Sequence, residues 1–277
     1  MERVPDGWLD ANRDNWDARA KLHLSTPEYD LGPLKDGTAS LSDIEHAELP
    51  DFRGKRVLHL QCHYGRDTLV FAQNGAAEVV GVDFSPKAIA QAREIAEELG
   101  YSDRAKFIEC NVYDTLDHIE GQFDLVFTSW GTINWLPDLG PWGQVMAGAL
   151  KPGGQFYIAD GHPAAFILDD LKPEADDRPG WFMPYFNDEV FREEQGQDYA
   201  GDNARLPGTD YCWNHPISET LGALWDAGLV VDRMREHDRI VWQMFNMLER
   251  GEDGMWRWPD KRWLPLSWSA LAHKPGS

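Results

Sequence analysis

Cysteine is scarce in this 277-residue sequence, and the three present are Cys62, Cys110 and Cys212. An odd count without a CxxC spacing argues against a disulfide framework, and we expect no metal site. Long apolar runs are missing too, since a stretch such as 79–82 is far too short to span a bilayer. The first residues lack the basic and then apolar pattern of a secretory signal. We therefore expect a cytoplasmic protein with reduced thiols, no metal and no membrane partner.

Basic residues are also few, because 26 lysines and arginines stand against 47 aspartates and glutamates, which gives a formal charge of −21. A surface of that sign repels phosphate backbones, so no nucleic-acid partner is expected. The chain has no G-x-S-x-G elbow, which argues against a serine hydrolase. It is rich in tryptophan, with 13 residues. Most should lie in the core, while some could wall a pocket for a flat or cationic ligand.

Short apolar stretches alternate with helical patterns through the middle of the chain. The predicted helices are 67–74, 139–150 and a segment that begins after a Ser85 cap with Pro86 at its first position. The predicted strands are 56–60, 79–83, 106–110, 123–129, 155–160, 229–234 and a last one within 264–274. This alternation predicts an α/β protein: a Rossmann-like, seven-stranded, mostly parallel sheet with helices on both faces.

Composition changes suggest four regions. Residues 1–52 form an N-terminal helical lid, with a helix at 8–23, and residues 53–160 form the core. Residues 161–215 are a cap inserted after strand five, and they include an acidic stretch at 169–180 that reads as a mobile surface loop. Residues 216–277 complete the sheet. The 8–23 helix carries Trp16, Arg19 and His23, and an ordinary amphipathic helix remains the alternative to a lid.

The stretch "VLHLQCHYG", residues 57–65, connects a predicted strand to a predicted helix. Open α/β sheets bind ligands at the carboxyl ends of their strands, near the point where the strand order reverses. Asp83 ends the next strand, 18 positions after Gly65, where a carboxylate would reach ribose hydroxyls. Together with "CNV" at 110–112 and "LKPGG" at 150–154, this pattern predicts a nucleotide-like cofactor.

With these motifs, residues 55–160 resemble a class I S-adenosylmethionine-dependent methyltransferase, and more loosely a subgroup of uncharacterised bacterial small-molecule methyltransferases with a "HLQCHYG" loop. The resemblance implies S-adenosylmethionine as the cofactor, with Asp83 on its ribose and Phe84 against its adenine. Asn111 would meet the adenine amino group and Val112 would supply adjacent backbone. The rest of the implied cofactor site is Gln61, His63, Gly65 and Ser129.

Three positions depart from the family pattern: His59 replaces an acid, while Gln61 and His63 replace glycines. Glycine permits a positive φ and a close approach of the backbone. We expect Gln61 and His63 to keep negative φ and point away, so that backbone groups still bind the cofactor. The alternative is that binding has been lost. His59 lies inside a strand and is interpreted as a core histidine.

Methyl transfer needs in-line alignment of the acceptor and exclusion of water, and a base only if the acceptor must lose a proton early. His162, two residues after strand five, is the first candidate base, and His215 in "YCWNHP" is the second. Either could instead cap a short helix. The predicted acceptor walls are Trp130, Asn134, Trp135, Tyr185, Tyr211 and Trp213, although most of these aromatics could simply be core.

The leading hypothesis is therefore methyl transfer to nitrogen or oxygen of a small molecule, with an aromatic or cationic acceptor and a homodimer left open. A lyase or cyclase that uses the same cofactor is a second hypothesis, and a non-catalytic ligand-binding member is a third. A nicotinamide-dependent oxidoreductase is disfavoured because residues 57–65 lack G-x-G-x-x-G.

Overall fold

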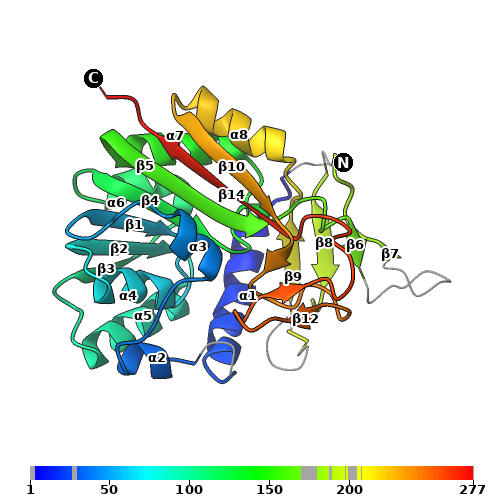
Figure 1. Cartoon of the computed structure of the whole chain (residues 1–277), viewed down its shortest axis with the longest axis horizontal. Helices are drawn as coiled ribbons and strands as arrows, with labels where there is room; N and C mark the ends of the chain where they lie inside the picture. Colours follow the sequence, from blue (N-terminus) through cyan, green and yellow to red (C-terminus); the bar gives the residue numbers. More distant parts are fainter. Residues whose placement is uncertain are drawn as a thin grey trace.

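The central sheet has the strand order β10-β14-β5-β4-β1-β2-β3 (Figure 1). This computed structural model describes residues 4–26, 30–169, 180–186, 189–196, 198, 205–206 and 208–276. β14 runs antiparallel to both of its neighbours, β10 and β5, and the remaining pairs, from β5 to β3, are parallel. The predicted mostly parallel seven-stranded sheet is thus confirmed. Its strands are β1 (Arg56–Leu60), β2 (Glu78–Asp83), β3 (Ala105–Glu109), β4 (Phe123–Ser129), β5 (Leu150–Gly161), β10 (Val230–His237) and β14 (Ser267–His273).

Helices cover both faces of the sheet and bury a separate apolar core on each (Figure 1). The fully buried Trp142 belongs to the first core, and Phe71 and Phe127 belong to the second. On the first face lie α6 (Thr115–His118), α7 (Leu139–Ala149), α8 (Ile217–Asp226) and the 3-10 helix η2 (Val112–Asp114). On the second lie α2 (Gly32–Lys35), α3 (Asp43–Glu48), α4 (Arg66–Gln73) and α5 (Pro86–Glu98). Burial on both faces explains the continuous apolar runs of the parallel strands.

Helix α1 (Trp8–His23) matches its predicted range and lies beyond the carboxyl ends of the strands (Figure 1). The predicted Ser85 cap also forms, and the structure shows a second cap that was not predicted. Ser85 Oγ accepts a hydrogen bond from Ala88 N at 3.1 Å, at the start of α5. In α3, Ser42 and Glu45 form a reciprocal capping box. These caps fix where each helix starts relative to the strand edge.

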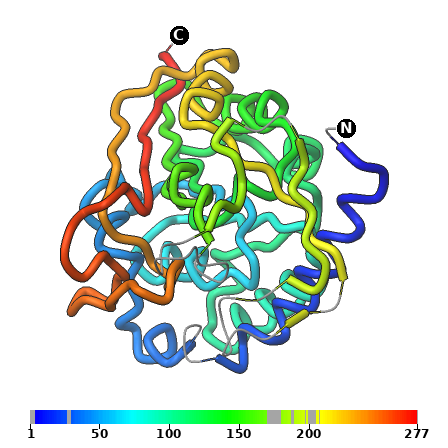
Figure 2. The backbone as a smooth tube through the Cα atoms, turned by 90° about the vertical axis from the view of Figure 1, so that its right-hand side faces the viewer, coloured from blue at the N-terminus to red at the C-terminus, as the bar shows by residue number. Residues whose placement is uncertain are grey.

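Two insertions gather at the carboxyl edge of the sheet. The first, the cap (residues 161–215), contains β6 (Leu168–Asp169), β7 (Gly180–Trp181), β8 (Phe191–Glu194) and β9 (Thr209–Cys212). The second, which we name the crown (residues 238–266), connects β10 to β14 and contains β11 (Arg239–Ile240), β12 (Glu249–Arg250) and β13 (Trp256–Arg257). Figure 2, viewed toward this edge, shows the crown on one side and α1 with β9 on the other.

The sequence patterns did not reveal the crown, because its strands are two residues long and carry no alternation. It has its own small core around the buried Ile240, Phe245 and Leu266. Residues 170–179 of the predicted acidic surface loop lie outside the described residues. The division into lid, core, cap and sheet completion also stays a prediction.

Candidate active site

The loop after β1 keeps a glycine-type backbone without most of the glycines. Gln61 has φ 56° and His63 has φ 53°, both in the left-handed region. The expectation of negative φ at these positions was therefore wrong: the loop retains its path, and the side chains bear a strain of about 1 kcal/mol or more each. Gly65, at φ 78°, is truly required, because a Cβ there would lie 2.4 Å from the Phe107 ring.

Asp83 lies directly beside this loop. Its Oδ2 accepts the His63 N–H at 2.8 Å, and its Oδ1 accepts the Ser85 N–H at 2.9 Å. Burial raises the pKa of Asp83 to about 6, and these backbone hydrogen bonds oppose the rise. A carboxylate oxygen has two lone-pair sites, so each still has capacity for a hydroxyl. The Asp83 carboxylate, which is predicted to bind the ribose, therefore connects the loop after β1 to the end of β2.

The predicted adenine end follows β2 and β3. Val112 is buried and Phe84 is half-buried. The Asn111 side-chain oxygen accepts the Tyr113 N–H at 3.2 Å and so caps η2. This is the turn-forming role, and the adenine role of Asn111 stays a prediction. Ser129 ends β4 in register with Ala159, buried below the loop that follows.

A third strained residue, Trp130, stands at the end of β4 with φ 50°. The Gln61 side chain reaches this region, where its Nε2 donates to Thr132 O at 2.9 Å. Among the described non-glycine residues, left-handed φ values occur at Gln61, His63, Trp130 and, in the cap, Gln195. Strained backbone collects at functional sites. Three of these four residues lie where β1 and β4 end.

Asp160, which the sequence treated only as a strand end, organises the loop at 130–135. Its Oδ1 accepts the N–H groups of Gly131 at 2.5 Å and Gly161 at 2.6 Å. Its Oδ2 accepts the N–H and the hydroxyl of Thr132 at 3.0 and 3.1 Å. Burial raises the pKa of Asp160 while these bonds favour its charged form. A carboxylate ending the fifth strand was the available signal.

Glu45 supports the same loop from α3 and was also missed. Its Oε1 accepts the Trp130 indole N–H at 3.1 Å and its Oε2 accepts the Ser42 N–H at 2.9 Å. Burial, reinforced by the nearby negative charge of Asp67, raises the pKa of Glu45 to about 7. On the other side, the Trp130 ring meets Trp242 of the crown edge-on, with centroids 6.3 Å apart. Trp130 is therefore held between α3 and the crown.

Helix α1 covers the cofactor loop. The Trp16 ring lies edge-on to His63 at 5.4 Å and to Trp135 at 5.3 Å. Asp17 accepts a hydrogen bond from the Ser85 hydroxyl at 2.5 Å, so α1 also reaches the start of α5. Whether α1 acts as a lid or is an ordinary amphipathic helix stays a prediction.

A buried charge network fastens α1 to the cap. The Arg19 guanidinium donates to Asp198 at 2.5 Å and to Asp210 at 2.8 Å, and His23 Nε2 lies 3.0 Å from Asp198. All four side chains are buried. The pKa of Asp210 is raised by burial, and the Arg19 charge opposes that rise. Buried charges of this kind require their partners, so the closed position of α1 is specific.

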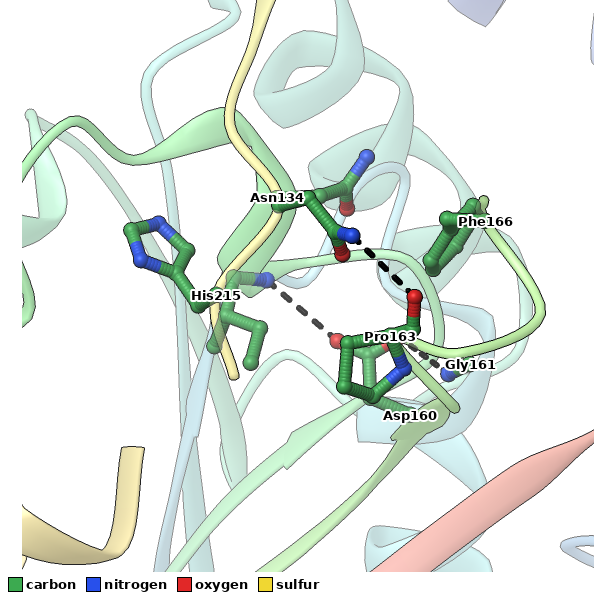
Figure 3. A pocket seen from close by; sticks show the side chains of 8 residues that line it. Asn134, Asp160, Gly161, Pro163, Phe166 and His215 are labelled. Atoms are coloured by element: carbon green, nitrogen blue, oxygen red, sulfur yellow. Dashed lines mark hydrogen bonds between the residues drawn. The ribbon is translucent and has the colours of Figure 1, made fainter. Parts of the chain in front are cut away.

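The ring nitrogens of the two candidate bases face neighbouring groups of the protein. His162 Nδ1 accepts the Ala164 N–H at 3.1 Å, and its Nε2 faces Glu236 at 3.1 Å. His215 Nε2 donates to Leu136 O at 2.7 Å and its Nδ1 faces Glu219 at 3.2 Å. Figure 3 shows the His215 ring directed away from Asp160 and Phe166. The geometry thus favours the structural role that the sequence left open, and catalysis by either histidine stays a prediction.

The predicted acceptor walls come together only in part. Asn134 and Trp135 lie in the 3-10 helix η3 (Ile133–Trp135), and Asn134 O accepts the Trp213 N–H at 2.8 Å. A cavity of about 10 Å³, room for roughly one water, lies here between the loop and the cap (Figure 3). Tyr211 pairs through its backbone with Asn12 of α1. Tyr185 instead packs against the exposed Phe186.

A methyltransferase domain model matches residues 51–198, more than half of the chain. The chain belongs to this family of methyltransferases. An uncharacterised methyltransferase of Synechocystis is 36% identical over 112 residues, 39% of this chain and 48% of that protein. The tRNA 5-carboxymethoxyuridine methyltransferase of Escherichia coli K12 is 32% identical over 110 residues, 38% and 41% of the two chains. The chain thus spans less than half the length of these curated relatives.

Solved structures share the fold at low identity. The CcbJ methyltransferase of Streptomyces caelestis has a TM-score of 0.63 at 17% identity, covering 95% of this chain and 98% of that one. An S-adenosylmethionine-dependent methyltransferase of Mesorhizobium loti gives 0.56 at 21% identity, covering 83% and 96%. The [4+2]-cyclase SpnF gives 0.51 at 16%, covering 88% and 81%.

The family is that of class I enzymes, whose cofactor is S-adenosylmethionine, and two features of the residues around the loop at 61–65 suit it. The left-handed backbone at Gln61 and His63 preserves the close approach that glycines normally provide. Asp83 has its carboxylate at that loop, in the position that suits ribose hydroxyls. No helix among the described residues is both long enough and apolar enough to cross a membrane.

Proposed function

We propose that this methyltransferase acts in the cytoplasm on a small molecule, transferring the methyl group to nitrogen or oxygen. The observation that carries the proposal is the convergence of Gln61, His63 and Trp130, all left-handed, beside Asp83. Such strain persists only where the surrounding contacts hold it, and it shapes a crevice at the ends of β1 and β4. The cover provided by α1 and the cap favours a small acceptor.

In this assignment the chain's residues bind and align rather than react. Asp83 accepts the ribose hydroxyls, Phe84 and Val112 pack against the adenine, and the backbone at 61–65 holds the methionine part. When bound, the sulfonium supplies an activated methyl group. Trp16 and Trp130 exclude water from the space between donor and acceptor, and this exclusion with in-line alignment is what methyl transfer requires.

Nitrogen is the favoured acceptor atom. His162 Nδ1 and His215 Nε2 already have hydrogen-bond partners, and the other ring nitrogen of each faces a glutamate, so neither histidine is positioned to take a proton early from a hydroxyl acceptor. An amine attacks through its lone pair and can lose its proton after the transfer. A relative, phosphoethanolamine N-methyltransferase 1 of Arabidopsis thaliana, 29% identical over 57% of this chain and 31% of its own, acts on nitrogen by its name.

An aromatic amine, or an amine that carries its positive charge on a group other than the reacting nitrogen, fits the surroundings best. Tryptophan rings from α1, the β4–α7 loop and the crown (Trp16, Trp130, Trp135 and Trp242) surround this edge. Ring faces attract cations and stack on flat ligands. The formal charge of −21 favours such a substrate over tRNA, although one relative acts on tRNA by its name.

The test is product analysis by mass spectrometry. Purified protein is incubated with S-adenosylmethionine and a panel of aromatic amines, alkyl amines and phenols. We expect S-adenosylhomocysteine together with a methylated amine. Methylthioadenosine would indicate a lyase instead, and methylation confined to phenols would contradict the preference for nitrogen. Reactions without acceptor give the background of cofactor breakdown.

A further inference from the structure

The crown contains a second cavity, of about 460 Å³, which the proposed methyl transfer does not use. Cavities of this size hold small metabolites. Half of its lining is basic, in a chain where acids outnumber bases by 47 to 26. The lining residues are Asp238, Arg239, Asp253, Arg257, Trp258, Asp260, Lys261 and Arg262.

Two of these arginines face each other. Arg239 of β11 and Arg257 of β13 are direct cross-strand partners, so their side chains leave the same face of the small sheet. Like charges in this position destabilise a strand pair. On its other side Arg257 pairs with Glu249 of β12. Arg239 has no second strand beside it, because β11 is the edge strand of this sheet and β13 is its neighbour.

The carboxylates of the cavity are already engaged. Asp253 is paired with Arg257 and also accepts the Met255 N–H at 3.1 Å. Asp238 pairs with Arg262 at 2.7 Å. Asp260 accepts the indole N–H of the neighbouring Trp263 at 3.1 Å, outside the lining set. The acidic residues that line the cavity thus have other partners close by.

Arg239 is left without such a partner. Within the described residues it makes no ion pair, and its buried Nε has no hydrogen-bond acceptor. A buried donor without an acceptor costs about 1–3 kcal/mol. Lys261, exposed at the rim, has its ammonium 5.2 Å from the Trp263 ring and makes no ion pair within the described residues. The nearest acids act on these two cations only at longer range, since the charges of Arg239 and Lys261 help to lower the pKa values of Asp253 and Asp260 respectively.

We propose that the crown cavity binds a small molecule through its phosphate or carboxylate group, held between Arg239 and Arg257 with Lys261 at the rim. The planar guanidinium fork suits both groups through paired N–H···O bonds. Such an anion separates the two arginine charges and supplies the acceptor that Arg239 Nε lacks. The crown core around Ile240 and Phe245 lies beside this site, which is independent of the methyl-transfer chemistry.

The test is calorimetric titration of the full chain with inorganic phosphate and, separately, with citrate, at constant ionic strength. We expect saturable binding of at least one anion, and its identity distinguishes a phosphate from a carboxylate ligand. Arg239→Gln should weaken that binding about tenfold or more. Arg13→Gln, which removes a surface arginine paired with Asp10, is the matched control and should leave binding unchanged. Equal affinity in wild type and Arg239→Gln would overturn the proposal, as would absence of saturable binding by both anions.

Thermal unfolding gives a second readout, which in the absence of anion does not involve binding. Without anion, Arg239→Gln should raise the unfolding midpoint, because the repulsion across β11 and β13 is removed. With the anion bound, wild type should gain stability and the variant should not. Should Arg239→Gln fail to fold, the exposed Lys261→Gln should still reduce affinity by about threefold. An unchanged affinity in that variant, with Arg239→Gln unfolded, counts against the site.

Discussion

The carboxyl edge of the sheet is built in two ways. On the side of β1, β2 and β3, each predicted cofactor residue either ends its own strand, as Asp83 ends β2, or lies within five residues after it. On the side of β4 and β5, Trp130 is fixed by Glu45, 85 positions earlier, and by the loop that Asp160 holds. Parallel-strand topology alone therefore assembles the first side, whereas the second depends on contacts between distant segments.

The largest expected effect is the loss of cofactor affinity when the Asp83 carboxylate is removed from the side of β1, β2 and β3. Asp83→Ala leaves the His63 and Ser85 N–H groups without their acceptor and removes the predicted ribose contact. We expect S-adenosylhomocysteine affinity to fall about 100-fold, ~2.7 kcal/mol, in calorimetry. Asp124→Ala is the control, since that carboxylate accepts hydrogen bonds from Arg56 N and Lys151 Nζ at the opposite edge of the sheet. Wild-type affinity in Asp83→Ala would remove Asp83 from the cofactor site.

The same carboxylate predicts a pH dependence. Its pKa in the free protein is about 6, raised by burial, and only the ionised form accepts from two ribose hydroxyls and the loop together. Affinity should therefore rise with pH through about 6 and then level off, and in Asp83→Ala this step should disappear. A step that persists in the variant would assign it to another group.

The second side is tested through Glu45. Its pKa is raised from 4.5 to about 7, so the folded protein binds more protons than the unfolded chain between these values. The stability that Glu45 contributes is full below pH 4.5 and falls as pH rises through 7. Glu45→Gln has no such loss, so its stability relative to wild type should improve by about 2 kcal/mol between pH 5 and pH 8.

Chemical denaturation at the two pH values measures this difference. Glu48→Gln serves as the comparison, because Glu48 is buried on the same helix but lies beside Arg235 and Ser269. A parallel shift in both variants would mean that the effect is not particular to Glu45. If Glu45→Gln shows no pH-dependent gain, its carboxyl is not protonated near neutrality and the contact with Trp130 is an ordinary ionised hydrogen bond.

The same contrast explains what the sequence could predict. The strands, the Ser85 cap and Asp83 were all found because periodicity and capping signals are local. Glu45 and the crown were not, since nothing near Glu45 in the chain indicates that α3 will meet Trp130. The sign of φ at Gln61 and His63 was predicted wrongly, because a local rule about side chains was applied where the tertiary structure imposes the backbone.

The smallest expected effect is a difference in stability between two variants of Gln61, which separates the contribution of its backbone conformation from that of its side chain. Both Gln61→Gly and Gln61→Ala lose the hydrogen bond to Thr132 O, but only glycine relieves the left-handed φ of 56°. At an ordinary position glycine is less stable than alanine by about 0.5–1 kcal/mol. Here we expect the opposite order, with Gln61→Gly more stable by about 1 kcal/mol in denaturant unfolding. Both variants should retain cofactor affinity if the backbone binds. If the alanine variant is the more stable, the loop at 61–65 does not hold a left-handed residue there, and the argument that strain marks this crevice loses its main support.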